Sequence, residues 1–472
     1  MDRYPTRRSP VHGDDVVASS SPLAAAAAQD VLRDGGTAAD AAVAAAMTLT
    51  VVEPTNNGIG GDLLALVWDG QRLHALNASG RSPRAWTPEH FAGHTEMPRR
   101  GWDSVTVPGA VSGWRALSDR FGRLPFARLG QAAVDHAERG WLVPTIVAQD
   151  WARAAAVLAD QPEFLAAFAP GGRAPAEGDR VRFPDHAAAL REILATGGDS
   201  FYRGALAERI AAHAAAGGGL LTAQDLADHE VEWTEPVFAS WGGHELCEVP
   251  PNSQGLAALV AAAVLERLGA AVLHAEVADP AWMRTSTEEL LAPEAEASLA
   301  ARVDPERASG AVSRPPTAGG TVYLSVGDRE GMMVSLIQSN YYGFGSGLVV
   351  PGTGIALHCR GAGFSLEPGH PNEVAGGKRP LNTIIPGFLT RGGEPVAAFG
   401  MMGGPMQPQG HVQVMHRLMA GQSVQQALDA PRWFVEGTGE LKLEAGWGDD
   451  VADALAAMGH PVTRTPVGDR TY

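Results

Sequence analysis

The apolar pattern near the N-terminus predicts two closely packed helices. Residues 24–33 are rich in alanine, begin after a proline at position 22 and end before Gly35. This is the pattern of a helix with proline in its first turn and glycine after its last. A second helix is predicted over residues 38–48, where alanines recur at helical spacing and form one narrow face.

A glycine- and asparagine-rich loop separates these helices from two predicted strands. The loop covers residues 51–61, and the apolar stretches 63–68 and 73–76 follow it. Asp69-Gly70 lies between the stretches and is a typical turn sequence, so we expect a hairpin.

The middle of the chain carries mainly helical patterns and then loses them. Residues 101–240 are predicted to be mostly helical, including a helix over 126–138 that ends at Gly140. Another helix is expected after Gly255, running to Leu268. Residues 270–319 are charged and rich in alanine and proline, which is typical of an exposed, mobile connector.

The pattern changes to strands at position 321. Residues 321–326 and 332–338 are β-rich and joined by a glycine-containing turn, which predicts a second hairpin. Further strands are expected over residues 384–389 and 396–399. Two more helices are predicted, over 409–419 and 424–430, the second with Ser423 and Gln426 as its capping box.

Composition narrows the classes of protein that this chain can be. The 472 residues carry a formal charge of −17, which disfavours nucleic-acid partners and an anionic membrane surface. No run of about 18 apolar residues and no apolar segment of a signal peptide is visible, so the expected location is the cytoplasm. Two cysteines, Cys247 and Cys359, are too few for a disulfide framework.

Common catalytic motifs are absent from the sequence. It has no G-x-S-x-G, H-E-x-x-H, C-x-x-C, P-loop or dinucleotide-binding glycine motif. The 15 histidines are scattered, and His411 and His416 are five residues apart, which does not place them on one helical face. We therefore predict neither a metal nor a cofactor.

The junction between Gly320 and Thr321 offers a different chemistry. If the chain is cut there, Thr321 gains a free α-amine, whose pKa of about 7.7–8.0 leaves part of it neutral at physiological pH. A hydroxyl needs a neighbouring base to act as a nucleophile, and this one residue would supply both. A Gly-Thr pair alone is common, so the argument needs further motifs.

Several motifs resemble the γ-glutamyltransferase family of N-terminal-nucleophile hydrolases. They extend over nearly the whole chain in the family's order. The matching segments are 21–44, Val52-Glu53-Pro54 with Gly58-Ile59-Gly60-Gly61, Val107-Pro108-Gly109-Ala110 with Gly113-Trp114, Pro251-Asn252-Ser253-Gln254-Gly255, Lys378-Arg379-Pro380-Leu381-Asn382-Thr383, and Gly403-Gly404.

The resemblance implies an α+β fold, a four-layer αββα sandwich, and self-processing. Thr321 resembles the family's nucleophile, which attacks the Gly320 carbonyl and divides the chain into a large subunit, residues 1–320, and a small subunit, residues 321–472. The two would form one compact domain, and further assembly into an oligomer stays open. The backbone N–H groups of Gly403 and Gly404 resemble the family's oxyanion hole, and Ser339 stands where the family has a threonine that hydrogen-bonds the nucleophile.

The substrate pocket departs from the family's pattern. Ser79 occupies the place of the arginine that binds the glutamate carboxylate, and Gly363 that of the acidic residue that binds its ammonium. Loss of one charge-assisted hydrogen bond to the substrate makes the free energy of binding less favourable by about 1.5–3 kcal/mol. Arg81 and Arg360 are then candidates to bind an acidic acyl group, and Tyr341 stands where transferases carry asparagine.

These departures resemble a branch of amidohydrolases and acylase-like enzymes that act on oxamate-type or other acyl amides. The resemblance also assigns Asn382 and Thr383 to the substrate pocket, and the substrate is expected to be a small-molecule acyl amide. The stretch 268–281 is abbreviated compared with the family, so the shape of the pocket and the efficiency of self-cleavage are expected to differ from the family's.

Four readings remain open at this point. They are an amidohydrolase or acyltransferase that uses a Thr acyl-enzyme, a true γ-glutamyl transferase or glutathione hydrolase, a biosynthetic enzyme that cleaves an unusual C–N or C–C acyl bond, and a non-processing homologue that only binds an acyl metabolite.

Overall fold

Two antiparallel sheets lie face to face at the centre of the molecule. The computed structural model describes residues 9–264, 277–300, 307–308 and 320–466. In spatial order, the first sheet contains β1 (Val16–Ser19), β9 (Gly320–Gly327), β10 (Met333–Tyr341), β2 (Asp62–Trp68), β3 (Leu73–Asn77) and β6 (Glu232–Thr234). The second contains β14 (Glu394–Phe399), β13 (Gly387–Arg391), β8 (His244–Glu248) and β7 (Val237–Trp241).

Strand β2 shows how the sequence specifies these layers. All seven of its residues are buried, because both faces of the strand are covered. Leu63, Ala65 and Val67 belong to the core beneath the helices, whereas Leu64 and Leu66 belong to the core between the two sheets. Successive side chains point to opposite faces, so one apolar run supplies both cores.

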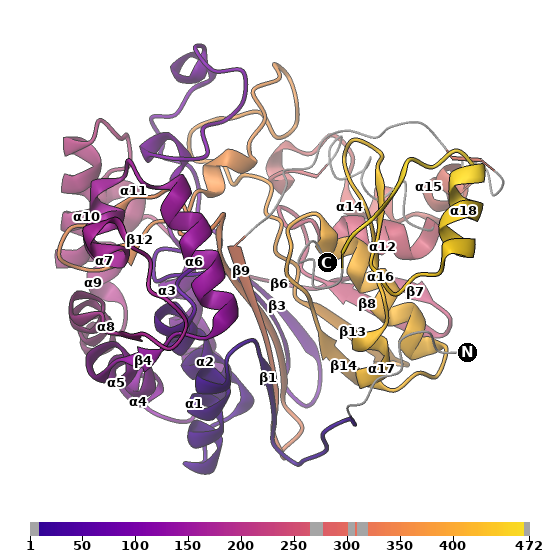
Figure 1. The fold of residues 1–472 in the computed structure, drawn as a ribbon, viewed down its shortest axis with the longest axis horizontal. Helices are drawn as coiled ribbons and strands as arrows, with labels where there is room; N and C mark the ends of the chain where they lie inside the picture. The colour runs from indigo at the N-terminus through magenta and orange to yellow at the C-terminus, as the bar shows by residue number, and fades with distance from the viewer. Residues whose placement is uncertain (1–8, 265–276, 301–306, 309–319, 467–472) are drawn as a thin grey trace.

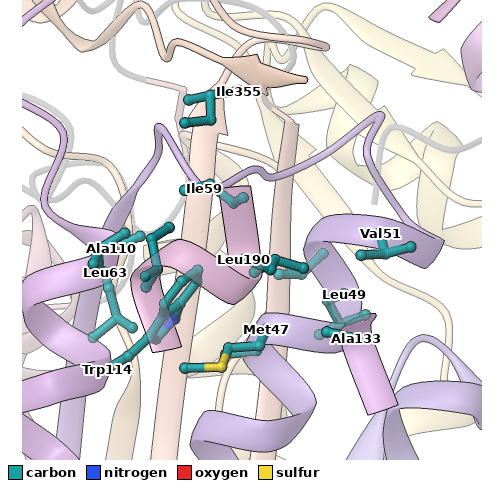
Figure 2. Packing of buried hydrophobic residues seen from close by; sticks show 14 of the residues in the cluster. Met47, Leu49, Val51, Ile59, Leu63, Ala110, Trp114, Ala133, Leu190 and Ile355 are labelled. Carbon is teal, nitrogen blue, oxygen red and sulfur yellow. The ribbon is translucent and has the colours of Figure 1, made fainter. Parts of the chain in front are cut away.

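Helices cover the outer face of the six-stranded sheet (Figure 1). The innermost is α2 (Ala38–Val52), whose residues are all buried and whose first turn is closed by a capping box between Thr37 and Asp40. Figure 2 shows part of this core, with Leu63, Ala110 and Trp114 close together. The other helices of this half are α1 (Pro22–Arg33), α3 (Ala110–Phe121), α4 (Phe126–Leu129), α5 (Gln131–Arg139), α6 (Thr145–Val157), α7 (Pro162–Phe168), α8 (Pro184–Thr196), α9 (Asp199–Arg203), α10 (Ala205–Ala216) and α11 (Ala223–Ala227).

Two helices cover the outer face of the four-stranded sheet. They are α12 (Gly255–Val264) and α16 (Met406–Met419), which contact each other and share a core with strands β8 and β13. The described chain thus has helices, sheet, sheet and helices in successive layers. The remaining elements are α14 (Thr287–Leu290), α15 (Pro293–Ala300), α17 (Val424–Asp429), α18 (Asp449–Ala457), the short strands β4 (Trp141–Leu142), β5 (Arg180–Val181), β11 (Val349–Val350), β12 (Ile355–Ala356), β15 (Trp433–Val435), β16 (Leu441–Leu443) and β17 (Val462–Arg464), and the 3-10 turns η1 (Pro88–Phe91), η2 (Trp102–Ser104), η3 (Pro170–Gly172), η4 (Pro280–Trp282) and η5 (Arg360–Gly363).

Most elements predicted from the sequence are confirmed, with boundaries that differ by a few residues. The two N-terminal helices, both hairpins and the Ser423–Gln426 capping box are present. The helix predicted over residues 126–138 is two helices, α4 and α5, divided at Gly130. The helix expected to reach Leu268 is described as far as Val264, and the positions beyond it lie outside the described residues.

The prediction of an exposed connector over residues 270–319 is wrong for residues 277–279, whereas positions 280–298 are exposed or half-buried wherever the structure describes their burial. Residues 277–279 are buried, and α14 and α15 follow them. The physical reason is Asp279, whose carboxylate accepts hydrogen bonds from the Arg81 guanidinium and from the Arg379 backbone N–H. The rest of the predicted connector, apart from positions 307–308, lies outside the described residues.

None of the helices in the described ranges combines the length and apolar character needed to cross a membrane.

Candidate active site

Thr321, Ser339 and Asp62 lie side by side on three neighbouring strands. In the sheet register Ser339 of β10 is opposite Thr321 of β9 on one side and opposite Asp62 of β2 on the other. All three side chains have the same phase as residues in the core between the sheets, such as Ile337 and Leu64. They therefore point into the layer between the sheets, at the end of that layer where the strands begin or finish.

The hydroxyl groups of Thr321 and Ser339 are hydrogen-bonded at 3.1 Å, and both residues are buried. The Ser339 hydroxyl donates to the carbonyl oxygen of Gly320 at 2.7 Å and accepts from the backbone N–H of Tyr341 at 2.9 Å. A serine hydroxyl has one proton, and here that proton is directed at Gly320. Thr321 must then donate to Ser339, which leaves the lone pairs of the Thr321 oxygen available for attack.

An irregularity in the sheet shapes the peptide between Gly320 and Thr321. The register of β10 against β9 shifts between Ser339 and Tyr341, so that Tyr341 is opposite Gly320. Tyr341 has a φ of 74°, a conformation that costs a non-glycine residue free energy and is often found at functional sites. Gly320 itself is closely surrounded, since a Cβ there would lie 3.1–3.2 Å from the backbone of Tyr342, Gly343 and Asn56.

A fully buried ion pair lies next to these hydroxyl groups. Arg360 Nε donates to Asp62 Oδ2 at 2.9 Å, and the Nη1 of Arg360 donates to the Thr383 hydroxyl at 3.1 Å. Asn382 Nδ2 also donates to Asp62 Oδ2, at 3.2 Å. Arg360 Nη2 and Asp62 Oδ1 are both buried and have no hydrogen-bond partner within the described part of the chain. A donor and an acceptor of this kind are suited to binding a polar ligand.

Tyr341 covers the guanidinium of Arg360. The Cζ of Arg360 lies 4.4 Å from the centroid of the Tyr341 ring, in cation–π contact. Burial raises the pKa of the Tyr341 phenol well above its usual value, so the ring stays neutral.

His358, two residues before Arg360, is neutral as well. Burial lowers the pKa of the His358 imidazole, and its Nδ1 accepts a hydrogen bond from the backbone N–H of Arg360 at 3.1 Å. Asp62 is therefore balanced by Arg360 and not by His358, whose Nδ1 is 3.8 Å from the carboxylate.

Gly403 and Gly404 offer two backbone donors. Their φ angles are 109° and 57°, which only glycine adopts readily, and within the described ranges neither N–H donates a hydrogen bond. Gly400, three residues before Gly403, lies against the ring of Tyr323, because a Cβ on Gly400 would be 2.4 Å from that ring. Tyr323 is two residues after Thr321 on β9, so the glycine segment runs beside the strand that carries the threonine.

Gln254 connects the glycine pair to Thr383. Its Nε2 donates to the carbonyl oxygen of Gly404 at 2.8 Å and also to that of Thr383. The side chain is fully buried at the start of α12. It therefore fixes the distance between the Gly404 backbone and the residue that holds Arg360.

Arg81 differs from the other candidates. Its guanidinium is half-exposed and pairs with Asp279 at 3.1 Å and Glu232 at 3.2 Å, and its Nη1 also donates to the Gly377 carbonyl. These contacts join β3 and its neighbours to the segment at Asp279. Within the described ranges Arg81 therefore forms hydrogen bonds and ion pairs with none of the other candidate residues. Those that the structure brings into one contact network are Thr321, Ser339, Tyr341, Arg360, Asn382 and Thr383.

Ser79 and Gly363, the two positions expected to depart from the γ-glutamyltransferase pattern, are both closely surrounded. The Ser79 hydroxyl donates to Asn77 Oδ1 at 2.7 Å in a buried cluster. A Cβ on Gly363 would lie 2.6 Å from the carbonyl oxygen of Leu381. An acidic side chain at position 363 would therefore require this backbone to move.

Asp62 and Gln254 were not singled out as site residues from the sequence. For Asp62 a signal was present, because a lone carboxylate directly follows Gly60-Gly61 and opens an otherwise apolar strand. Its partner Arg360 is 298 residues away, and no local pattern links the two.

In the described ranges no group of three or more His, Cys, Asp or Glu side chains is arranged to hold a metal ion.

Comparison with known proteins identifies the family. Residues 24–470 match the family model described as Gamma-glutamyltranspeptidase. The chain belongs to this family.

Its relatives in the gamma-glutamyltranspeptidase family include several proenzymes. The chain is 36% identical to the oxamate amidohydrolase proenzyme of Klebsiella pneumoniae, over 92% of this chain and 88% of that protein. It is 32% identical to the acylase ACY 1 proenzyme of Pseudomonas sp. strain SE83, over 92% and 85%. Among solved structures, the cephalosporin acylase from Bacillus halodurans superimposes with a TM-score of 0.93 at 42% identity, covering 98% of this chain and 91% of that one.

These matches establish that this member of the gamma-glutamyltranspeptidase family is an enzyme, a hydrolase of the N-terminal-nucleophile type, with the mixed α+β fold of that group. The predicted family is therefore confirmed, and its similarity to amidohydrolases and acylases agrees with the predicted branch.

Proposed function

We propose that this protein is a self-processing threonine amidohydrolase or acyltransferase that cleaves a small acyl amide through an ester on Thr321. The observation that carries the proposal is the hydrogen-bonded series from Thr321 Oγ1 through Ser339 Oγ to the Gly320 carbonyl oxygen. One buried serine hydroxyl thus contacts both the hydroxyl that we assign as nucleophile and the carbonyl group that it would attack.

In the processing step, the Thr321 hydroxyl oxygen attacks the Gly320 carbonyl carbon. The C–O bond of an ester forms, the C–N bond of the peptide breaks, and the hydroxyl proton passes to the released amine. Water then hydrolyses the ester, giving a carboxylate on Gly320 and a free amine and hydroxyl on Thr321. The products are the large subunit, residues 1–320, and the small subunit, residues 321–472.

Ser339 assists this step by stabilising the negative charge that develops on the Gly320 oxygen. Removing one such donor typically costs about 10²–10³-fold in rate. We therefore expect Ser339→Ala to slow self-cleavage by about that factor, followed as conversion of precursor to two chains over time on denaturing gels. Ser339→Thr keeps the hydroxyl and is the matched control. Equal cleavage rates for wild type and Ser339→Ala would show that Ser339 is a packing residue only.

In turnover, the same hydroxyl attacks the substrate amide and the new α-amine of Thr321 accepts its proton. An α-amine has a pKa of about 7.7–8.0, which suits a general base near neutral pH. The N–H groups of Gly403 and Gly404, which donate to no acceptor among the described residues, are assigned to the oxyanion of the tetrahedral intermediate. Water resolves the acyl-enzyme in hydrolysis, and an amine resolves it in transfer.

We assign the acyl group of the substrate to the buried polar surface formed by Arg360, Asp62 and Thr383. The free Nη2 of Arg360 suits a carboxylate or carbonyl oxygen of a short acyl group, and the cation–π contact with Tyr341 holds the guanidinium in place. Asn382 donates to the same Asp62 oxygen as Arg360. This fits an oxamate-type amide, the substrate in the name of one relative. Arg81 is the weaker candidate, because two carboxylates already engage it.

True γ-glutamyl transfer is the second candidate, since glutathione hydrolases are among the relatives, at 27% identity. The absence of a carboxylate at Gly363, and the closeness of the Leu381 carbonyl there, argue against it. A non-processing binding protein is the third candidate, and the complete Thr321–Ser339–Gly320 arrangement argues against that.

Mass spectrometry of the intact protein, fresh and aged, tests the proposal. We expect the chain of 49.2 kDa to give two fragments that meet between Gly320 and Thr321. Incubation with a panel of acyl amides, including oxamate and a γ-glutamyl anilide, should add an acyl mass to the small fragment at Thr321. A preparation that remains uncut and inactive would contradict the proposal, and rapid turnover of the anilide alone would favour the γ-glutamyl alternative.

A further inference from the structure

A polar cavity lies at the far end of the six-stranded sheet from Thr321. It has a volume of about 510 Å³, within the range of about 300–1,000 Å³ that is usual for small-molecule sites. It lies where the β2–β3 turn, the end of α3 and the start of β10 meet, and its lining residues are Thr37, Asp69, Arg72, His74, Arg120, Phe121, Gly122, Arg123 and Met332.

The position of this cavity separates it from the candidate active site. Ser339 pairs with Asp62 at one end of β2, and Met333 pairs with Trp68 at the other. Six residues of strand span about 20 Å. Ligands at the two ends therefore have no contact residue in common.

Two arginines that line the cavity have no carboxylate partner in the part of the chain that the structure describes. Within the described ranges neither Arg72 nor Arg120 forms an ion pair, and both are exposed. Arg123 also lines the cavity, but both of its terminal nitrogens donate to Glu330. The guanidinium groups of Arg72 and Arg120 are thus the positive charge that the cavity offers, in a chain whose formal charge is −17.

The guanidinium of Arg120 is held in place. Its Cζ lies 4.3 Å from the ring centroid of Trp233 and 5.3 Å from that of Phe121. Its Nη2 donates to His74 Nδ1 at 3.0 Å, and His74 Nε2 is 2.7 Å from Asp69 Oδ2. Since Nδ1 accepts from the arginine, the Nε2 of His74 carries the proton and donates it to Asp69.

The carboxylate in the cavity, that of Asp69, accepts hydrogen bonds from backbone N–H groups of the β2–β3 turn in which it lies. Asp69 Oδ1 accepts the backbone N–H groups of Gln71 and Arg72, at 2.8 and 2.9 Å. Burial would raise the pKa of Asp69, but the bonds from His74 and these two amides lower it to about 2. Both oxygens of Asp69 therefore already accept hydrogen bonds. The remaining N–H donors of Arg72 and Arg120 are not occupied by Asp69 and can bind a ligand.

We propose that this cavity binds a small oxyanion, a carboxylate or a phosphate, between Arg72 and Arg120. Planar guanidinium groups bind two oxygens of such an anion at once. Phe121 and Met332 supply an apolar edge for the carbon part of a ligand, and the volume of the cavity suits a small molecule.

Calorimetric titration of the full-length protein with inorganic phosphate and, separately, with malonate tests this proposal. We expect saturable binding of at least one of the two anions, weakened about tenfold or more in Arg72→Gln and in Arg120→Gln. The matched control is Arg173→Gln, which removes an exposed arginine far along the chain that pairs with Asp179 at 3.5 Å. It should bind like the wild type.

The two titrations identify the chemistry of the ligand. Binding of phosphate alone supports a site for phosphate groups, and binding of malonate alone supports a site for carboxylates. Arg72 is exposed, so its variant is expected to fold, and an unchanged melting temperature checks this. Equal affinity in wild type and Arg72→Gln would overturn the proposal, since the anion would then bind elsewhere, for example beside Arg360. Absence of saturable binding of both anions to the wild type would overturn it as well.

Discussion

Replacing Thr321 by alanine is expected to leave a single chain of 49.2 kDa and no measurable turnover. The variant lacks the oxygen that attacks Gly320 in processing and the acyl group in catalysis. Loss of a nucleophile that acts as a unit with its partners lowers kcat by about 10⁶-fold in well-studied hydrolases. The measurements are a denaturing gel, the intact mass and the rate of amide hydrolysis.

Two further variants separate the role of the hydroxyl from that of the fold. Thr321→Ser keeps the nucleophile and should still give two chains, at a changed rate. Ser325→Ala removes a hydroxyl from the same strand four residues further on and should cleave like the wild type. Cleavage after Gly320 in Thr321→Ala would contradict the assignment, because another group would then have to be the nucleophile.

The elements of this fold were predictable where a local pattern decides them. The alanine faces of α1 and α2, and the two apolar stretches around Asp69-Gly70, each specify an element over fewer than about 16 residues. The segment at 277–279 was not predictable in the same way. Its burial depends on Asp279 meeting Arg81 and Arg379, which are about 200 and 100 positions away.

The candidate site was also predictable only where its residues are linked by local patterns or short-range pairing. Thr321 and its neighbour Gly320 were predicted from the sequence, and the hairpin of β9 and β10 brings Ser339 beside them by short-range pairing. The charge balance was not predicted, because Arg360 is neutralised by Asp62 on another strand. The sequence therefore suggested a free arginine for an acidic group, whereas the structure contains an ion pair with one unused donor and one unused acceptor.

Removal of the Asp62 carboxylate is expected to destabilise the protein strongly. In Asp62→Ala the guanidinium of Arg360 stays fully buried without a counter-charge, and breaking a buried pair in this way costs about 3–5 kcal/mol. The expected result is a marked drop in the midpoint of urea unfolding, measured by circular dichroism. Asp62→Asn keeps the shape and one acceptor, so it is the matched control and should lose less.

The double variant Asp62→Leu/Arg360→Met distinguishes stability from function. Replacing both members of a buried ion pair by apolar residues of similar size is often neutral or stabilising, so the unfolding midpoint should return toward that of the wild type. Amide hydrolysis should stay low, because the donor assigned to the acyl group is gone. If this double variant regained the hydrolysis rate along with the stability, the ion pair would be a structural element only, and the acyl group would have to bind through other residues such as Arg81.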